Sequence, residues 1–123
     1  GLDNDKFNLT IKNLRFANES IKYFVEKNLK DNSTISNINK FVILNKNFFL
    51  QPEEVVFRSL TEVLKGVGKK YYPVRGKKID KLIYQIKHGN YFKTTLGNCV
   101  IKRVNNSIII FQDNYYRLYI IFS

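Results

Sequence analysis

Apolar residues recur at helical spacing along the N-terminal part of the chain. Between residues 3 and 30 they fall mostly three, four or seven positions apart, which places them on one side of an α-helix and charged residues on the other. Asp3 and Asp5 stand near the start, where the helix dipole favours acids. The pattern predicts an amphipathic helix with an apolar stripe made of Phe7, Ile11, Leu14, Ile21, Phe24, Val25 and Leu29.

A polar segment, residues 31–40, follows this helix. Its Asp, Asn and Ser side chains compete for backbone hydrogen bonds, so we expect the helix to end there and a linker to begin. Residues 41–50 form two apolar runs and fit either a short strand with a loop or a tight helical turn. We expect three parts: an amphipathic helical arm over 1–32, a linker and short apolar segment over 33–50, and a compact domain over 51–123.

Two further helices are predicted in the next part of the chain. A proline followed by two glutamates at positions 52–54 is typical of a helix start, and Gly66 and Gly68 are expected to end this helix. The second helix covers residues 76–88, where apolar residues recur at i, i+3, i+4 and i+7. Gly89 then follows as a left-handed helix end.

Beyond the second helix the pattern changes to β-branched and aromatic runs. Two-residue pairs that tolerate positive φ separate these runs, namely Gly97-Asn98, Asn105-Asn106 and Asp113-Asn114. We expect a small antiparallel β-meander whose last strand lies within residues 115–123. A helix pair that covers one face of such a meander makes the fold class α+β.

Composition adds a strong positive charge to this picture. The chain has 21 Lys and Arg against 10 Asp and Glu, a formal charge of +11, which favours encounter with polyanions such as nucleic acid. Eight basic residues fall between positions 65 and 87, where Asp80 is the only acid. This gathering favours a surface that faces a polyanion, and the alternative is an ordinary solvated face.

Composition also excludes several classes of protein. With 123 residues, 44% of them hydrophobic, the chain can bury a core, which excludes global disorder and a large multidomain enzyme. One cysteine and one histidine exclude an internal disulfide and the usual zinc ligand sets. Without a long apolar run or a secretory signal, we expect a cytoplasmic protein with no membrane partner. Because the chain begins with Gly1 and contains no Met, we expect a fragment.

The segment between the two predicted helices, residues 66–78, combines glycines, basic residues and tyrosines. Glycine allows close approach of the backbone, cations neutralise phosphates, and a tyrosine can stack on a base. The alternative for Tyr71 and Tyr72 is that they fill the core. The candidate nucleic-acid-binding residues are Lys65, Lys69, Lys70, Tyr71, Arg75, Lys77, Lys78 and Lys81.

Other chemically reactive residues have simpler explanations. Cys99 is flanked by apolar strand residues and is expected to be a small buried hydrophobe, while His88 suits the negative end of a helix dipole. Lys102 and Arg103 are neighbours in a strand and point to opposite faces, which leaves open which of them joins the basic surface. We expect no catalytic residue and no metal site in this chain.

Residues 48–112 carry an ordered set of motifs. They run from FFLQPEEVVFRSLTEVLKGVG through a Tyr-Pro and basic stretch and a helix ending in His-Gly to TLGNCVIKR. This order resembles the segment that follows the catalytic domain in bacterial tRNA(Ile)-lysidine synthetases. Asn98 stands where that family is expected to have another glycine, and residues 115–123 have no counterpart in the resemblance.

The resemblance implies part of a ligase that adenylates the wobble cytidine of an isoleucine tRNA and joins lysine to it. The Ser-Gly-Gly-x-Asp-Ser loop of its ATP pyrophosphatase domain does not occur here. The implied partners are tRNA and the missing N-terminal catalytic domain. ATP, lysine and Mg are implied for the parent enzyme, and no cofactor for this chain, which would be inactive alone. The alternative is a non-enzymatic adaptor or dimerisation module that uses the N-terminal helix and the aromatic C-terminal strand.

Overall fold

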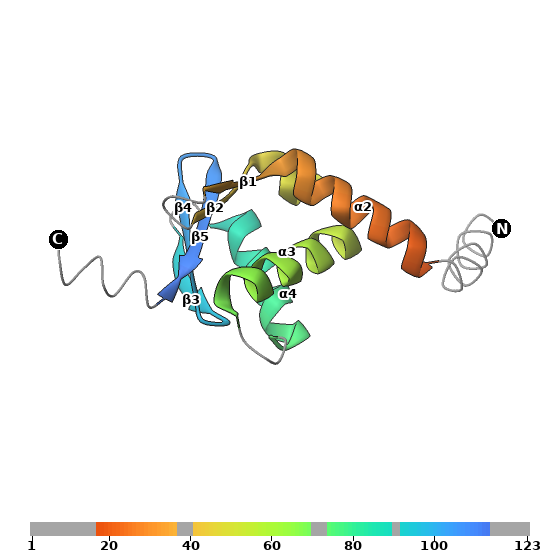
Figure 1. The fold of residues 1–123 in the computed structure, drawn as a ribbon. Coiled ribbons are helices and arrows are strands. Elements are labelled where there is room, and N and C mark those ends of the chain that lie inside the picture. Colours follow the sequence, from red (N-terminus) through yellow and green to blue (C-terminus); the bar gives the residue numbers. More distant parts are fainter. Residues whose placement is uncertain (1–16, 37–40, 70–73, 90–91, 114–123) are drawn as a thin grey trace.

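The computed structural model describes residues 17–36, 41–69, 74–89 and 92–113 (Figure 1). The first half of the expected N-terminal helix and the expected last strand, residues 115–123, lie outside these ranges. The helices are α2 (Ala17–Asn32), α3 (Glu53–Gly68) and α4 (Gly76–His88), with a short 3-10 helix, η1 (Lys46–Leu50). The strands are β1 (Ser33–Ser36), β2 (Phe41–Leu44), β3 (Lys93–Leu96), β4 (Cys99–Val104) and β5 (Ser107–Gln112).

The five strands form one antiparallel sheet in the order β1-β2-β5-β4-β3. Strands β3, β4 and β5 are the predicted meander, and β5 also pairs with β2. Two of the three predicted turn pairs supply the positive φ angles that tight hairpins need, with 61° at Gly97, 64° at Asn98 and 55° at Asn105, while Asn114 of the third pair lies outside the described residues. The α+β fold class with a helix pair and a meander is therefore confirmed.

The core lies between one face of this sheet and the helices (Figure 1). Side chains alternate between the two faces of a strand, so every second residue of β4 and β5 points toward the helices. From the strands, the fully buried side chains on this side are Leu44, Cys99, Ile101, Ile108 and Ile110. From the helices they are Phe48, Val56, Leu60, Leu64 and Ile79.

The segment expected to be a linker contains a strand. Ser33–Ser36 pairs with Phe41–Leu44 in antiparallel register, with Ile35 opposite Val42. Because β1 is an edge strand, its polar side chains meet water, so it lacks the apolar alternation by which a strand is recognised. Both alternatives for residues 41–50 occur in succession, as strand β2 and then η1.

A buried amide joins α2 to α3 and η1. Asn28, 3% exposed, donates from Nδ2 to the carbonyl oxygen of Phe48 at 3.3 Å and to Ser59 Oγ at 3.2 Å. Its Oδ1 accepts a hydrogen bond of 2.9 Å from Asn32. This buried polar side chain is therefore satisfied on both its donor and its acceptor atoms. Phe24, expected on the apolar stripe, is instead 52% exposed.

The end of α3 falls at the second of the two expected glycines, whereas the conformation of Gly89 after α4 differs from the expected one. Helix α3 continues through Gly66 and ends at Gly68, and Lys69 takes the left-handed conformation at φ 54°. Gly89 does not adopt a left-handed conformation, because its backbone is extended at φ −101° and ψ 139°. Its N–H still donates to the carbonyl oxygen of Gln85 at 2.9 Å, which ends α4 without a positive φ.

Candidate nucleic-acid interface

The turn between β3 and β4 contacts both ends of the connection between α3 and α4. Asn98 Nδ2 donates to the carbonyl oxygen of Gly68 at 3.1 Å, in the last turn of α3. Val74, just before α4, lies on Gly97 so closely that a Cβ on this glycine would be 2.6 Å from Val74 Cγ2. The end of α3 and the approach to α4 therefore meet at the same turn.

Gly68 sets how closely α3 approaches this turn. A Cβ on Gly68 would lie 2.0 Å from the carbonyl oxygen of Gly97, far inside van der Waals contact. Cys99, fully buried as expected, adds a 3.4 Å hydrogen bond from Sγ to the carbonyl oxygen of Leu64. The TLGNC sequence thus has a direct structural role, since it supplies the positive φ angles and the contacts that fix α3.

The contact at this turn presents cations from both helices to solvent. We define the basic face as the six cations of the described residues in and beside this junction. All six are exposed, and none forms an ion pair with another described residue. Two acids, Glu62 and Asp80, are exposed in the same part of the chain. The basic face consists of Lys65, Lys69, Arg75, Lys77, Lys78 and Lys81.

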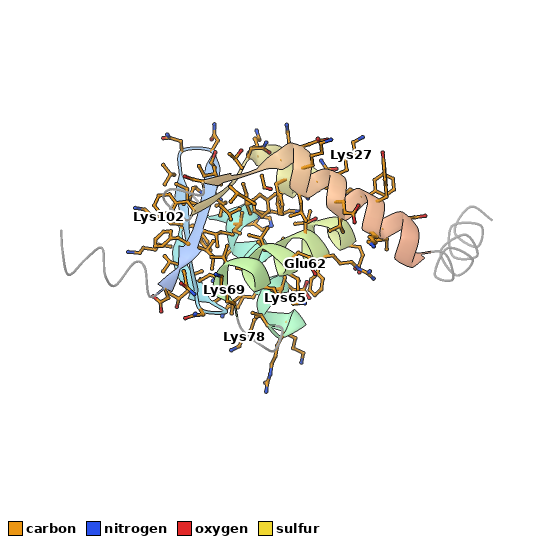
Figure 2. All side chains as sticks on the ribbon, in the orientation of Figure 1. Lys27, Glu62, Lys65, Lys69, Lys78 and Lys102 are labelled. Carbon is orange, nitrogen blue, oxygen red and sulfur yellow. The ribbon has the colours of Figure 1, made fainter. Side chains whose placement is uncertain are left out.

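Three cations of the basic face lie toward the same side in Figure 2. Figure 2 shows Lys65, Lys69 and Lys78 toward the bottom of the view, whereas Lys27 and Lys102 lie on other sides. Two of the predicted binding residues, Lys70 and Tyr71, fall outside the described residues, as does Tyr72. The other six predicted residues are exposed on the two helix ends that the β3–β4 turn brings together.

A shallow hollow of about 260 Å³ lies beside the basic face, between α4 and β3. Its polar wall offers two ammonium groups, two hydroxyls and an amide, all of which can donate to phosphate oxygens. Leu82 and Leu96 contribute apolar surface. The polar lining residues are Lys78, Lys81, Gln85, Thr94 and Thr95.

Sequence reasoning missed Tyr84, an exposed tyrosine on α4. Tyr84 is 65% exposed, and its ring centroid lies 4.4 Å from that of His88, with 41° between the ring planes. It follows Lys81 by three positions, so the two side chains are neighbours on the helix surface. The signal was present in the sequence, because a helix that buries Ile79 and Leu82 places Tyr84 on its opposite side.

The structure also separates Lys102 from Arg103. Arg103 lies on the helix side of the sheet, where its Nη2 donates to the carbonyl oxygen of Ile86 near the end of α4. Its Nε is buried and has no hydrogen-bond partner among the described residues. Lys102 is exposed and lies away from Lys65, Lys69 and Lys78 (Figure 2). Neither residue belongs to the basic face.

In the part of the chain that the structure describes, no group of three or more His, Cys, Asp or Glu side chains is placed to hold a metal ion. Within the same residues, none of the helices combines the length and the apolar character needed to cross a membrane.

Comparison with known proteins identifies no family for this chain. No family model matches it, and neither a curated protein nor a solved structure matches it. The basic face and the motifs of residues 48–112 are therefore the features of the chain that bear on its function.

Proposed function

We propose that this chain binds tRNA through the basic face, as the tRNA-engaging part of an ATP-dependent ligase of the tRNA(Ile)-lysidine synthetase type. The observation that carries the proposal is the set of six exposed cations without ion-pair partners among the described residues, on two helix ends that contact one turn. The resemblance of residues 48–112 supports tRNA as the polyanion. The chain itself performs no catalysis in this proposal.

The charges on α4 support an anionic partner rather than a purely structural role. Helix α4 begins with Gly76, Lys77 and Lys78, and its first turn contains no acid. A helix N-terminus carries partial positive charge, so lysines there disfavour the helix. Stability of α4 therefore does not explain these side chains, whereas a phosphate backbone would neutralise both the lysines and the helix dipole.

The role we assign to these contacts is positioning. Phosphate contacts fix the register of a nucleic acid without reading its sequence, so the basic face would orient the tRNA for a catalytic domain elsewhere in the parent enzyme. ATP, lysine and Mg would be used by that domain. A cytoplasmic location is part of the proposal, because the parent ligase would meet its tRNA there.

Filter binding across a range of salt concentrations tests the proposal. With an isoleucine tRNA transcript, we expect weak affinity that falls steeply with salt, because each phosphate contact releases counterions. A DNA duplex of similar length should bind less tightly, since the duplex lacks the tRNA shape. Absence of binding, salt-independent binding or equal affinity for the DNA would contradict the proposal. In a lysine incorporation assay the chain alone should give no product.

A second candidate function is a protein adaptor or dimerisation module, which exposed apolar side chains favour. On α2, Tyr23 is 59% and Phe24 52% exposed, with their ring centroids 5.3 Å apart. On the edge strand β1, Ile35 is 67% exposed. The aromatic C-terminal strand of this hypothesis lies outside the described residues. Sedimentation that shows a stable dimer, together with indifference to RNA, would favour this function.

A further inference from the structure

The outer side of α4 carries two aromatic rings in line with two cations of the basic face. Lys77, Lys81, Tyr84 and His88 follow one another at spacings of four, three and four residues, so their side chains form one row along the helix. Tyr84 is 65% exposed, so packing in the core does not explain it. The buried side chains of α4 point to the opposite side: Ile79, Leu82 and Ile86.

Contact between the rings of Tyr84 and His88 orders the Tyr84 side chain before a planar ligand stacks on it. The ring centroids of Tyr84 and His88 are 4.4 Å apart, and the planes are tilted by 41°. Such a contact between residues four apart restricts the tyrosine side chain, which reduces the entropy lost when a ligand orders it. Since Tyr84 is mostly exposed, its ring remains accessible to solvent.

We propose that Tyr84 stacks on an unpaired base of the RNA whose phosphates contact Lys77 and Lys81. The inference rests on the proposed function and adds a preference for RNA with a single-stranded loop or end. Lys81 and Tyr84 are three residues apart, so the two side chains can contact neighbouring parts of one strand. Side chains cannot reach the base edges in the deep, narrow major groove of an A-form helix, so proteins mostly recognise unpaired RNA bases. Aromatic side chains commonly bind such bases by stacking on them.

Tyr23 on α2 provides a matched control. It is 59% exposed and also has an aromatic neighbour, Phe24, at 5.3 Å. Acidic and basic residues are mixed around it, with Glu26 exposed near Lys22 and Lys27. A substitution at Tyr23 therefore removes a similarly exposed tyrosine from a helix that does not belong to the basic face.

The test compares two RNAs and three variants of the full chain. One RNA is a hairpin with an unpaired adenosine loop, and the other is its stem alone as a blunt duplex. We expect Tyr84→Ala to weaken binding to the hairpin by about 5- to 100-fold and to leave duplex binding within about 2-fold. Tyr84→Phe should keep most of the hairpin affinity, and Tyr23→Ala should match the wild type. A fluorescent adenine analogue in the loop should be quenched by wild type and by Tyr84→Phe, and not by Tyr84→Ala.

Three results would overturn the inference while leaving the proposed function intact. They are a Tyr84→Ala variant that binds the hairpin like Tyr23→Ala, equal losses for hairpin and duplex, and a Tyr84→Phe variant as weak as Tyr84→Ala. A wild-type chain that binds neither RNA in a salt-dependent way would overturn the proposed function, and the inference with it. Because Tyr84 is exposed, the three variants should unfold at the wild-type denaturant concentration.

Discussion

Helices α2 and α4 both present an exposed tyrosine, but the charges around the two tyrosines differ. On α4, Tyr84 follows Lys77, Lys78 and Lys81, with Asp80 as the one acid of that helix. On α2, three lysines around Tyr23 are mixed with the acids Glu26 and Asp31. Exposure of an aromatic ring therefore does not by itself point to nucleic acid, and the proposed RNA surface on α4 rests on the excess of lysines around Tyr84.

The two helices also differ in what attaches them to the rest of the fold. Helix α2 is joined to α3 and η1 by hydrogen bonds from Asn28 to Ser59 and to the carbonyl oxygen of Phe48. The junction of α3 and α4 is fixed at the β3–β4 turn, where Gly68 allows close backbone contact with Gly97. A change at the turn should therefore affect both stability and RNA binding, while a change at Asn28 should affect stability alone.

The largest expected effect comes from reversing charge on α4. The triple variant Lys77→Glu, Lys78→Glu and Lys81→Glu should bind tRNA at least about 100-fold more weakly at moderate salt, because phosphate contacts become repulsions. Reversing three lysines of α2, Lys22, Lys27 and Lys30, changes the net charge equally and serves as the control. Filter binding measures both variants. Similar losses for the two would show that net charge, rather than the basic face, determines affinity.

Gly68→Ala should have the next largest effect, and Gly66→Ala is its control in the same helix. A Cβ at position 68 would meet the carbonyl oxygen of Gly97, whereas one at position 66 has no atom within 4 Å. We expect Gly68→Ala to lower the free energy of unfolding by about 1–3 kcal/mol and to weaken RNA binding. Gly66→Ala should raise that free energy by up to about 1 kcal/mol. Urea denaturation of both variants checks this, and equal stability would refute the close contact.

Asn28→Ala should lower stability without changing RNA affinity. The substitution leaves Ser59 and the Phe48 carbonyl without the partner that Asn28 now provides, at a cost of about 1–3 kcal/mol in the free energy of unfolding. The control, Lys27→Ala, alters an exposed neighbour in the same helix turn. Urea denaturation and filter binding on the same samples separate the two quantities. Loss of RNA affinity in a folded Asn28→Ala variant would contradict the division between α2 and α4.

The smallest effect is expected for Asn98→Gly. Glycine relieves the positive φ of 64°, but the hydrogen bond to Gly68 is lost, so the two effects should nearly cancel, to within about 1 kcal/mol. Asn98→Ala loses the hydrogen bond and keeps the unfavourable φ, so it should cost about 1–3 kcal/mol. Equal denaturation midpoints for Asn98→Gly and Asn98→Ala would argue against the left-handed turn.

Sequence patterns predicted the helices and strands whose formation depends on neighbouring residues in the chain. The bounds of α4 agree with the structure, because four apolar residues at helical spacing and a glycine delimit it. Strand β1 was missed because a polar edge strand has no alternation to read. The contact of Asn98 with Gly68 joins residues 30 positions apart, so no local pattern contains it.

Part of the candidate site was also predictable from the sequence, because its basic residues lie close together along the chain. Clustering of lysines in the sequence predicted the six exposed cations of the basic face. Tyr84 was overlooked although the apolar stripe predicted for residues 76–88 already placed it on the opposite side of that helix. The spacing of three residues places Tyr84 beside Lys81, and burial of Ile79 and Leu82 leaves it facing solvent.

Mapping the RNA contact by amide chemical shifts tests the central claim most directly. The uniformly labelled chain is titrated with an isoleucine tRNA transcript, and the amide signals are followed residue by residue. We predict that the shifts concentrate at the end of α3 and along the outer side of α4, from Lys65 to His88, and spare α2. Shifts concentrated on α2 and β1, or no shifts at tRNA concentrations that saturate filter binding, would contradict the account.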